Sequence, residues 1–286
     1  MISAQQQINS LREELNLHNH NYYVEDNATI SDYEFDVKLK ELETLENTHP
    51  EFYDANSPSQ RVGGTITKNF NTIIHQNRMY SLDNSYSKDD LLDWEKRLQK
   101  NLGTETIEYT CELKYDGASI NLSYENGNFI KAVTRGDGFQ GDEVTQNIRT
   151  IRSIPLKVSS SFMDNFEMRG EIILPLEGFQ KMNEVRLLNG EEVYRNPRNT
   201  ASGSLKLQDS SEVAKRPLDC LLYQVVTDER KYATHYDSLL AARKAGFKIP
   251  KTIILASSIE EVFRFVNEWD VKRHQLPYET DGVVIK

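Results

Sequence analysis

The chain has 286 residues, with 34 lysines and arginines against 44 aspartates and glutamates, a formal net charge of −10 and two cysteines. This composition is typical of a soluble, cytoplasmic globular chain. Two cysteines exclude a disulfide framework and a four-cysteine zinc site. No apolar run approaches the roughly 18 residues of a membrane span. The acidic balance argues against a surface that mainly clamps nucleic-acid phosphates, because such binding needs clustered lysine and arginine.

The first 50 residues predict two helices. Ile8, Leu11 and Leu15 repeat at the spacing of one helix face. A second helix is predicted to begin at Ser31, where Ser31-Asp32-Tyr33-Glu34 fits a capping box, and to end before a proline at position 50. Between them, residues 21–24 (Asn-Tyr-Tyr-Val) are predicted to form an elbow.

Residues 56–68 contain serine, proline and paired glycine in the proportions of a linker. We therefore expect a boundary between a helical domain over residues 1–66 and a second domain over residues 67–286. The part of this linker from Ser57 to Gly64 would allow a hinge between the two.

The second domain changes to a pattern of short strands mixed with helices. Strands are predicted over residues 107–113, 118–124, 129–134, 166–174 and 218–226, and helices over residues 88–100, 175–188, 237–245 and 258–269. Residues 125–128 (Glu-Asn-Gly-Asn) are a strong hairpin signal. Hairpins mixed with helices predict an α+β fold with antiparallel sheets rather than a doubly wound one. Residues 282–286 predict a buried strand, an unusual place for a domain to end.

One glycine motif resembles a dinucleotide fingerprint without having its context. Residues 136–141 match G-x-G-x-x-G and follow a strand. That strand is the second arm of a predicted hairpin, whereas the fingerprint requires a parallel βαβ unit, and residues 142–152 are too short for the crossover helix. The motif therefore does not support an oxidoreductase, and no P-loop sequence occurs in the chain.

The segment Cys111-Glu112-Leu113-Lys114-Tyr115-Asp116-Gly117 carries the clearest chemical signal. Alternation along a strand puts Glu112, Lys114 and Asp116 on one face. An amine between two carboxylates could be a nucleophile beside groups that bind a substrate or a metal. Carboxylates stabilise the protonated amine, however, so a nucleophile here needs a compensating cation. The competing interpretation is a solvated strand face with alternating charges.

Three further segments could complete a nucleotide-phosphate site. They contribute Arg135 on a glycine-rich turn, Glu171 in an Arg-Gly-Glu sequence, and Lys286 at the end of an apolar strand. The six histidines lack the spacing of zinc ligands, so surface or capping roles are expected for them.

Lys114-Tyr115-Asp116-Gly117 is the K-x-D-G motif of the covalent nucleotidyltransferases. The series CELKYDG, TRGDG, MRGEI, RNPRNTASGSLK and TDGVVIK, in this order, resembles the adenylation region of bacterial NAD-dependent DNA ligases. The N-terminal part is similar too, in its Tyr22-Tyr23 pair, in D-x-x-F-D over residues 32–36, in SPSQRVGG and in SLDN over residues 81–84. The resemblance covers essentially the whole chain and implies a small helical NMN-binding domain followed by an ATP-grasp-like nucleotidyltransferase domain.

The resemblance implies a role for each matching residue. Lys114 would attack the α-phosphorus of NAD⁺, form lysyl-AMP and release NMN. Asp116 and Glu171 would hold the ribose or Mg²⁺ (or Mn²⁺), and Glu112 would accept the adenine amino group. Tyr223 would stack on adenine, unless it is an ordinary core tyrosine. Lys286 would neutralise the α-phosphate and supply the compensating cation. The other implied nucleotide contacts are Arg135, Ser81 and Leu82.

The helical domain would bind the NMN half. The residues implied there are Tyr22, Tyr23, Asp32, Tyr33, Glu34, Phe35 and Asp36. Aromatic faces and carboxylates suit the cationic nicotinamide ring. Two departures from the family pattern are visible: Phe35 stands where tyrosine is common, and Lys206 stands where arginine is common, which would replace a bidentate phosphate contact with a point charge.

The resemblance implies a monomer that binds no membrane and whose complete form seals nicked double-stranded DNA. Arg195, Arg198 and Lys206 would form a basic strip for the DNA backbone. Zinc would be needed only by C-terminal modules that this sequence lacks, so we expect the chain to be part of a longer ligase. Two rival interpretations remain: an ATP-dependent ligase or RNA-end enzyme that shares K-x-D-G, and a catalytically idle NAD⁺-sensing module.

Overall fold

The computed structural model describes residues 3–25, 27–61, 69–104, 106–159, 161–229 and 231–286. The side chain of Asp32 and the second half of the predicted linker lie outside this described part.

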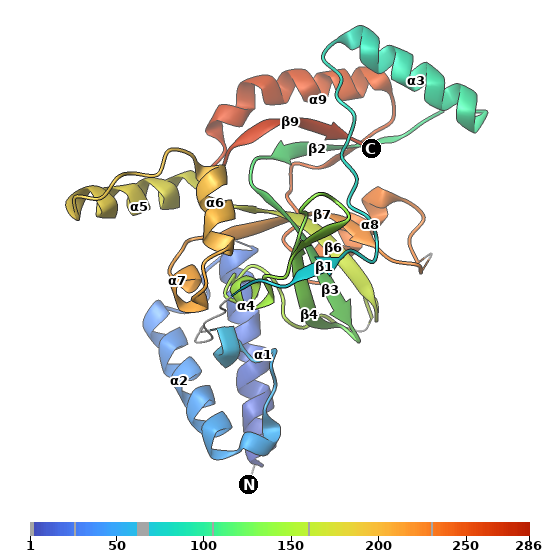
Figure 1. The fold of residues 1–286 in the computed structure, drawn as a ribbon. Helices are drawn as coiled ribbons and strands as arrows, with labels where there is room; N and C mark the ends of the chain where they lie inside the picture. Colours follow the sequence, from blue (N-terminus) through green and yellow to red (C-terminus); the bar gives the residue numbers. More distant parts are fainter. Residues whose placement is uncertain (1–2, 26, 62–68, 105, 160, 230) are drawn as a thin grey trace.

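Two helices form the N-terminal end of the molecule, α1 (Ala4–Tyr23) and α2 (Asp32–Thr48), and they lie side by side (Figure 1). Ser3 and Ser31 cap them, each within a capping box, which confirms the signal at Ser31. The small core between the helices contains Ile8, Leu11, Leu15 and Leu42. The predicted elbow at residues 21–24 is wrong for its first three residues, because they form the last turn of α1.

Two short 3₁₀ helices follow, η1 (Pro50–Phe52) and η2 (Pro58–Arg61). The second lies in the predicted linker but is buried. The Arg61 guanidinium donates to the backbone oxygens of Ile151 (3.1 Å) and Ile154 (2.9 Å). Residues 57–61 are thus held against the second domain in this structure, and the predicted hinge stays a prediction.

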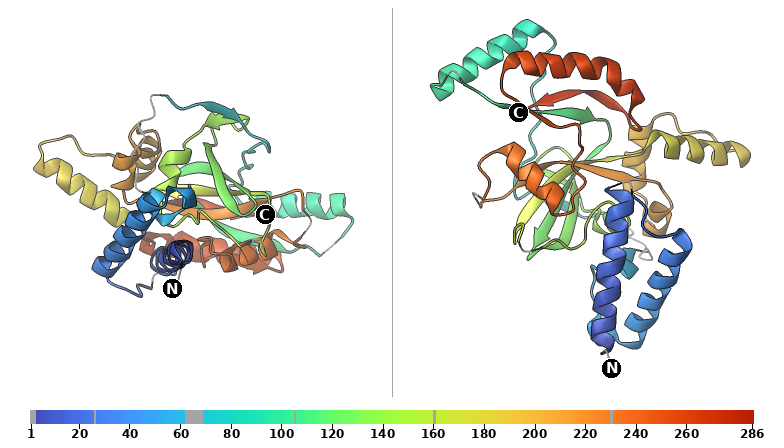
Figure 2. Two further views of the ribbon diagram at one scale, coloured as in Figure 1. Left: turned by 90° about the horizontal axis from the view of Figure 1, so that it is seen from below. Right: turned by 180° about the vertical axis from the view of Figure 1, so that it is seen from behind.

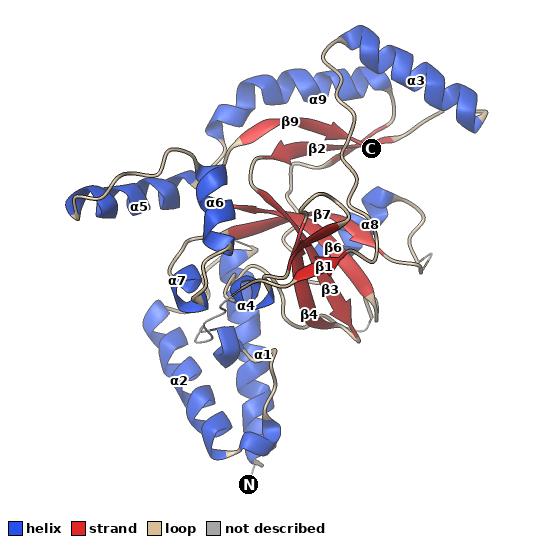
Figure 3. Cartoon of the chain, in the orientation of Figure 1, coloured by secondary structure: helices blue, strands red, loops and turns tan. Residues whose placement is uncertain are grey.

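In the described part of the chain, the second domain contains three antiparallel sheets (Figure 3). The four-stranded sheet has the order β4-β3-β6-β7, from β3 (Ala118–Glu125), β4 (Asn128–Thr134), β6 (Phe166–Ile173) and β7 (Asp219–Val226). The three-stranded sheet has the order β8-β2-β9, from β2 (Tyr109–Tyr115), β8 (Ile254–Ala256) and β9 (Thr280–Ile285). A third pairs β1 (Thr72–Ile74) with β5 (Gln140–Asp142). The chain is thus an α+β protein, as predicted.

The helices that follow the N-terminal pair lie around the sheets (Figure 1). They are α3 (Lys88–Leu102), α4 (Thr145–Arg149), α5 (Leu176–Leu188), α6 (Pro197–Leu205), α7 (Ser210–Ala214), α8 (His235–Lys244), α9 (Ile259–Lys272) and η3 (Arg273–Gln275). Helix α5 projects away from the sheets (Figure 1). The four-stranded sheet lies between the N-terminal helices and the three-stranded sheet, which α9 covers (Figures 1 and 2). Within the described residues, no helix is both long enough and apolar enough to cross a membrane.

The predicted hairpin and glycine turn both have a clear backbone cause. Asn126 (φ 49°) and Gly127 (φ 71°) link β3 to β4 in left-handed conformations, which confirms the hairpin. Gly136 (φ 55°) opens a tight turn between β4 and β5, where a Cβ atom would lie 1.9 Å from the backbone oxygen of Gln140. The G-x-G-x-x-G match therefore arises from an antiparallel turn.

The terminal strand differs from its prediction. β9 pairs only with β2 and forms one edge of its sheet, so its residues are half-buried or exposed instead of enclosed on both sides. The register pairs Cys111 with Ile285 and Glu112 with Val284. This pairing brings the end of the chain beside the most informative sequence segment.

Candidate active site

The central strand β2 carries the predicted amine and its neighbouring carboxylates. Lys114 is about half exposed, and its Nζ lies 2.7 Å from Oδ2 and 2.8 Å from Oδ1 of Asp281, near the beginning of the edge strand β9. Glu112, two residues earlier, is only 2% exposed. A carboxylate this deeply buried rules out the interpretation of a solvated strand face.

Asp116 and Glu171 come together at the end of β2 through a close approach of two strands. A Cβ atom on Gly117 would lie 2.2 Å from the backbone oxygen of Ile172 and 3.0 Å from Cγ of Glu171. Only glycine allows this approach, even though its φ is not left-handed. The turn between β2 and β3 is thereby pressed against β6.

The two carboxylates differ in their partners. Asp116 Oδ1 lies 2.9 Å from Arg198 Nη1, at the beginning of α6. Glu171 Oε2 accepts a hydrogen bond from Ser119 Oγ at 2.7 Å. Burial raises the pKa of Glu171 to about 7, although the Ser119 hydrogen bond and the charges of Arg198, Arg135 and Lys114 each act to lower it. Three cations therefore face one carboxyl group that titrates near neutrality.

A second cluster surrounds Glu112. Its Oε1 lies 2.9 Å from Lys286 Nζ and 2.8 Å from His235 Nε2. Lys286 Nζ also donates to the backbone oxygen of Tyr223 (3.0 Å) and lies 5.2 Å from the centre of that ring. Burial lowers the pKa of Lys286, and the adjacent Glu112 acts in the opposite direction.

This cluster bears on two of the predictions. Lys286 pairs with the buried Glu112 carboxylate, and its expected role as the compensating cation for Lys114 stays a prediction. A surface or capping role was expected for His235, but its side chain also contacts the buried Glu112 carboxylate. Tyr223 lies half-buried at this cluster, and burial raises its pKa.

The remaining predicted nucleotide residues lie on connecting segments. Arg135 is exposed on the turn after β4, where its backbone nitrogen donates to Ser119 O at 3.1 Å. Ser81 and Leu82 are exposed on the segment between β1 and α3. Among the described residues, neither Ser81 nor Leu82 forms a hydrogen bond or ion pair with the Lys114 or the Glu112 cluster.

Asp116 and Glu171 could bind a metal ion only together with further ligands from a substrate. No group of three or more histidine, cysteine, aspartate or glutamate side chains in the described ranges is arranged to hold a metal. Mg²⁺ is commonly bound through one or two carboxylates together with waters and substrate phosphates. Asp116 and Glu171 could supply the two carboxylates of that pattern once Glu171 is ionised and Asp116 exchanges Arg198 for the metal ion.

A cavity of about 300 Å³ lies at the carboxyl end of α1. Its lining comprises His18, Asn19, Tyr22, Tyr23, Ala28, Thr29, Ile30, Ser31, Phe35, Asp36 and Arg152. Four predicted NMN residues are therefore brought together there: Tyr22, Tyr23, Phe35 and Asp36. Tyr33, which is 78% exposed, and Glu34, which bonds to its own helix cap at Ser31, are not among the lining residues.

Arg152 completes this cavity from the second domain. Its Nη1 donates to Tyr23 Oη at 3.1 Å, and its guanidinium carbon lies 5.8 Å from the ring centres of both Tyr23 and Phe35. Lys248 Nζ donates to the backbone oxygen of Tyr23 at 2.7 Å. The cavity therefore has an acidic side chain from the helical pair and a basic one from the segment after α4.

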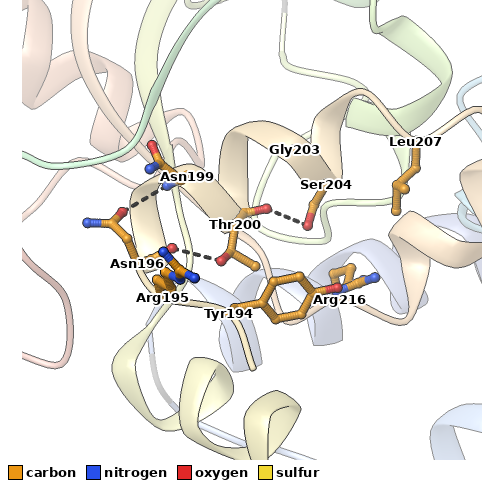
Figure 4. Close-up of a pocket in the computed structure, with 9 residues that line it drawn as sticks. All are labelled: Tyr194, Arg195, Asn196, Asn199, Thr200, Gly203, Ser204, Leu207 and Arg216. Atoms are coloured by element: carbon orange, nitrogen blue, oxygen red, sulfur yellow. Dashed lines mark hydrogen bonds between the residues drawn. The ribbon is translucent and has the colours of Figure 1, made fainter. Parts of the chain in front are cut away.

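The predicted basic strip is divided among separate ion pairs. Arg195 pairs with Glu192 (3.1 Å) and Lys206 pairs with Asp142 (2.7 Å), both at exposed positions. Another cavity, of about 330 Å³, lies along α6, and its lining includes Arg195, Tyr194 and Arg216 (Figure 4). Only Arg198 turns towards the β2 cluster.

Four residues of these sites were missed as site residues in the sequence: Ser119, Arg152, His235 and Asp281. Ser119 and Asp281 belong to or adjoin the motifs that were recognised, so extending each motif by a few positions would have included them. Arg152 and His235 carry no local signal, because each reaches its site from a segment distant along the chain.

Two family models match the chain. One, described as the NAD-dependent DNA ligase adenylation domain, matches residues 67–286; the other, described as the DNA ligase-like N-terminal NAD⁺-binding domain, matches residues 1–63. Curated relatives named DNA ligase include those of Flavobacterium johnsoniae, 65% identical over 285 residues, and Christiangramia forsetii, 61% identical over 285 residues. Both alignments cover 100% of this chain and 43% of the relative, so the chain spans less than half the length of these proteins.

Proposed function

The chain belongs to the family of NAD-dependent DNA ligases, and on that premise we propose that it binds NAD⁺ and transfers its AMP half to Lys114. The observation that carries this proposal is the position of Lys114, an exposed amine on a buried strand, paired with Asp281 and facing Glu171 among several cations. We also propose the division into a helical domain, residues 1–66, and an adenylation domain, residues 67–286; the limits of the two family matches support it.

In the proposed reaction, the Lys114 ammonium first loses a proton, for which the nearest acceptor is the Asp281 carboxylate at 2.7 Å. The free amine attacks the α-phosphorus of NAD⁺ and forms a P–N bond, while the P–O bond to the NMN phosphate breaks. NMN leaves with the bridging oxygen, the attacking nitrogen releases its second proton to solvent, and AMP remains on the lysine as a phosphoramidate. Arg135 and Arg198 are the cations available to the negative charge that develops on the phosphate.

The base of the nucleotide would lie against Tyr223. The neighbouring Glu112 carboxylate can accept the adenine amino group, and the Lys286 ammonium can donate to a ring nitrogen. A role for Lys286 at the base differs from the one expected at the phosphate; the contacts of Lys286 with Glu112 and Tyr223 support it. Ser81 and Leu82 remain proposed pocket residues on the strength of the family pattern alone.

The NMN half would occupy the cavity at the end of α1. Its opposite charges match the two ends of a zwitterion: Asp36 suits the cationic nicotinamide ring, and Arg152 suits the 5′-phosphate. Tyr22, Tyr23 and Phe35 supply aromatic faces for the ring. Asp32, Tyr33 and Glu34 remain proposed on the family pattern, and of these Glu34 would have to leave its cap to reach a ligand.

Asp116 and Glu171 would hold Mg²⁺ or Mn²⁺ together with substrate phosphate oxygens. A bound divalent ion would supply positive charge to the phosphates of the nucleotide. Within the chain itself, Ser119 and Arg198 hold these two carboxylates in their present orientation.

The complete protein would pass AMP to the 5′-phosphate of nicked double-stranded DNA in the cytoplasm and act as a monomer, with zinc confined to parts outside this sequence. Of the basic strip, Arg195 and Lys206 would contact the DNA backbone by exchanging their acidic partners for phosphates. Arg198 would first serve the nucleotide.

The direct test is to incubate the chain with NAD⁺ labelled in its adenine half and to detect covalent label after denaturation. Label is expected on the wild type and on the exposed-surface control Lys100→Ala, and none on Lys114→Ala. Label on Lys114→Ala would overturn the nucleophile assignment, whereas an unlabelled wild type would leave only an NAD⁺-binding module.

Thermal shifts separate the proposal from the ATP-dependent rival. Stabilisation by NAD⁺ and by NMN alone is expected, because the cavity at α1 binds the half that ATP lacks. Stabilisation and labelling by ATP instead, with no response to NMN, would favour the rival.

A further inference from the structure

We propose that His235 is a positioning residue for the nucleotide base: it holds the Glu112 carboxylate and leaves one proton of Lys286 free to recognise adenine. The inference rests on the proposed NAD⁺ function and deepens it, since it names how adenine would be selected over other purines.

Glu112, His235 and Lys286 form a compact, mostly buried group. Both the imidazole Nε2 (2.8 Å) and the ammonium Nζ (2.9 Å) approach the same oxygen, Oε1 of Glu112. The side chains of His235 and Lys286 are 25% and 23% exposed, against 2% for Glu112. Glu112 is therefore the most enclosed of the three side chains, and the two nitrogen donors are the more exposed.

The short distance to Glu112 determines which proton His235 carries. A carboxylate oxygen only accepts, so Nε2 at 2.8 Å must be the donor and must carry a hydrogen. An Nε2 atom with a hydrogen has no lone pair to offer Lys286 Nζ, 3.4 Å away. The imidazole thus cannot compete for the protons of the ammonium.

Lys286 then has one donor left for a ligand. Its ammonium carries three hydrogens. One is directed to Glu112 Oε1 and one to the backbone oxygen of Tyr223 at 3.0 Å. The third is available beside the Tyr223 ring, whose centre is 5.2 Å from Nζ.

The resulting pattern of one acceptor and one donor matches adenine. The exocyclic amino group of adenine donates, which suits the second oxygen of Glu112, and the adjacent ring nitrogen N1 accepts, which suits Lys286. Hypoxanthine has the reverse pattern at these two atoms, with an oxygen that accepts and a protonated N1 that donates. A site that holds this arrangement rigidly should therefore reject hypoxanthine, because buried polar groups would be left unpaired.

The fold fixes the position of His235. It is the first residue of α8, directly after the cap Thr234, whose hydroxyl bonds to Asp237, and its backbone oxygen accepts from Ser238 Oγ at 2.6 Å. The helix packs beside β7, which carries Tyr223. The histidine therefore reaches the base site from an element other than those that carry Glu112 and Lys286.

Two amide substitutions test the role. The amide of His235→Gln can reach the position of Nε2 and donate to Glu112, whereas the shorter amide of His235→Asn reaches only the position of Nδ1. Single-turnover self-adenylation would be measured for each variant over a range of NAD⁺ and of nicotinamide hypoxanthine dinucleotide concentrations.

We expect His235→Asn to raise the half-saturating NAD⁺ concentration by about tenfold, the usual cost of one charge-assisted hydrogen bond, with little change in the maximal rate. It should also reduce the preference for NAD⁺ over the hypoxanthine analogue. His235→Gln should retain both properties within about twofold. NMN-induced stabilisation, which uses the other cavity, should be equal in all three proteins and verifies that the variants are folded.

The inference is overturned if Asn and Gln behave alike, or if the preference for adenine survives in both. These results differ from a failure of the proposed function, in which the wild type itself takes up no label. A loss of maximal rate with unchanged half-saturation would also contradict it, because it would assign His235 to the chemical step.

Discussion

Lys114 Nζ lies 2.7 Å and 2.8 Å from the two carboxylate oxygens of Asp281, 167 residues further along the chain. The pair joins the central strand β2 to the edge strand β9 and is partly exposed. Asp281 therefore holds the amine in place and is also the nearest base to the proton that must leave before any attack.

Replacing Asp281 by Asn should slow self-adenylation by about 10²-fold at neutral pH, the typical contribution of one positioned base. The measurement is the single-turnover rate at saturating NAD⁺. Raising the pH should recover part of the loss, because solvent can then take the proton, and Asp281→Glu should lose less. An unchanged rate in Asp281→Asn would show that the carboxylate only pairs with the resting amine.

Replacing Glu171 by Gln should stabilise the chain at alkaline pH. Burial raises the pKa of Glu171 from 4.5 to about 7, so the folded state disfavours the ionised form. Below pH 4.5 both states are protonated and wild type and variant should be alike. Above pH 7 the wild type is destabilised, by up to about 3 kcal/mol at 1.36 kcal/mol per pKa unit.

The check is the free energy of unfolding from denaturant titrations at pH 5.5, 7 and 8.5. The difference between Glu171→Gln and wild type should grow from pH 5.5 to pH 7 and then level off towards pH 8.5, because the penalty saturates once the pH exceeds the pKa in the folded state. A constant difference would mean that the carboxyl group keeps its ordinary pKa.

Replacing Arg152 by Gln should weaken NMN binding by about tenfold or more, because a charge-assisted contact to the phosphate is lost. Nicotinamide riboside, which lacks the phosphate, should bind both proteins equally in calorimetric titrations. Arg152→Lys should fall between the two, and the exposed neighbour Lys157→Gln should resemble the wild type. Equal weakening of both ligands would instead indicate a general collapse of the cavity around Tyr23.

Replacing Gly117 by Ala should cost about 2 kcal/mol or more of unfolding free energy, because the new methyl group would lie 2.2 Å from Ile172 O. Gly203→Ala is the matched control, because Gly203 lies in the α6 helix and a Cβ atom there meets nothing within 4 Å. This substitution should stabilise the chain by no more than about 1 kcal/mol. The comparison is made by thermal unfolding. Similar losses of unfolding free energy in both variants would show that the close approach of β2 and β6 is not the reason why position 117 requires glycine.

Local rules accounted for much of the fold. The capping box at Ser31 and the hairpin at Asn126-Gly127 each depend on residues close in sequence, and both were confirmed. The expected alternation along β2 was not, because the strand ends at Tyr115 and its register is irregular between Leu113 and Tyr115. Distant packing decided other features of the fold. Arg61 ties the predicted linker to the second domain, and the last turn of α1 extends through Tyr23, whose hydroxyl and carbonyl oxygen both accept bonds from that domain.

The candidate sites follow the same division. Motif residues such as Lys114, Asp116 and Glu171 were identified in the sequence because each motif places particular residue types at a constant spacing. Their partners were not, since an ion pair such as Lys286 with Glu112 forms across 174 positions of the chain.

The sequence by itself determined the α+β class, the family resemblance and the chemical groups available, because hydrophobic periodicity and motif spacing are local properties. The tertiary structure alone decided which charges meet: Lys286 with Glu112, Arg198 with Asp116, and Arg152 with the tyrosines of α1. Electrostatic interactions depend on distance and burial, and both are set only when the strands and helices have packed.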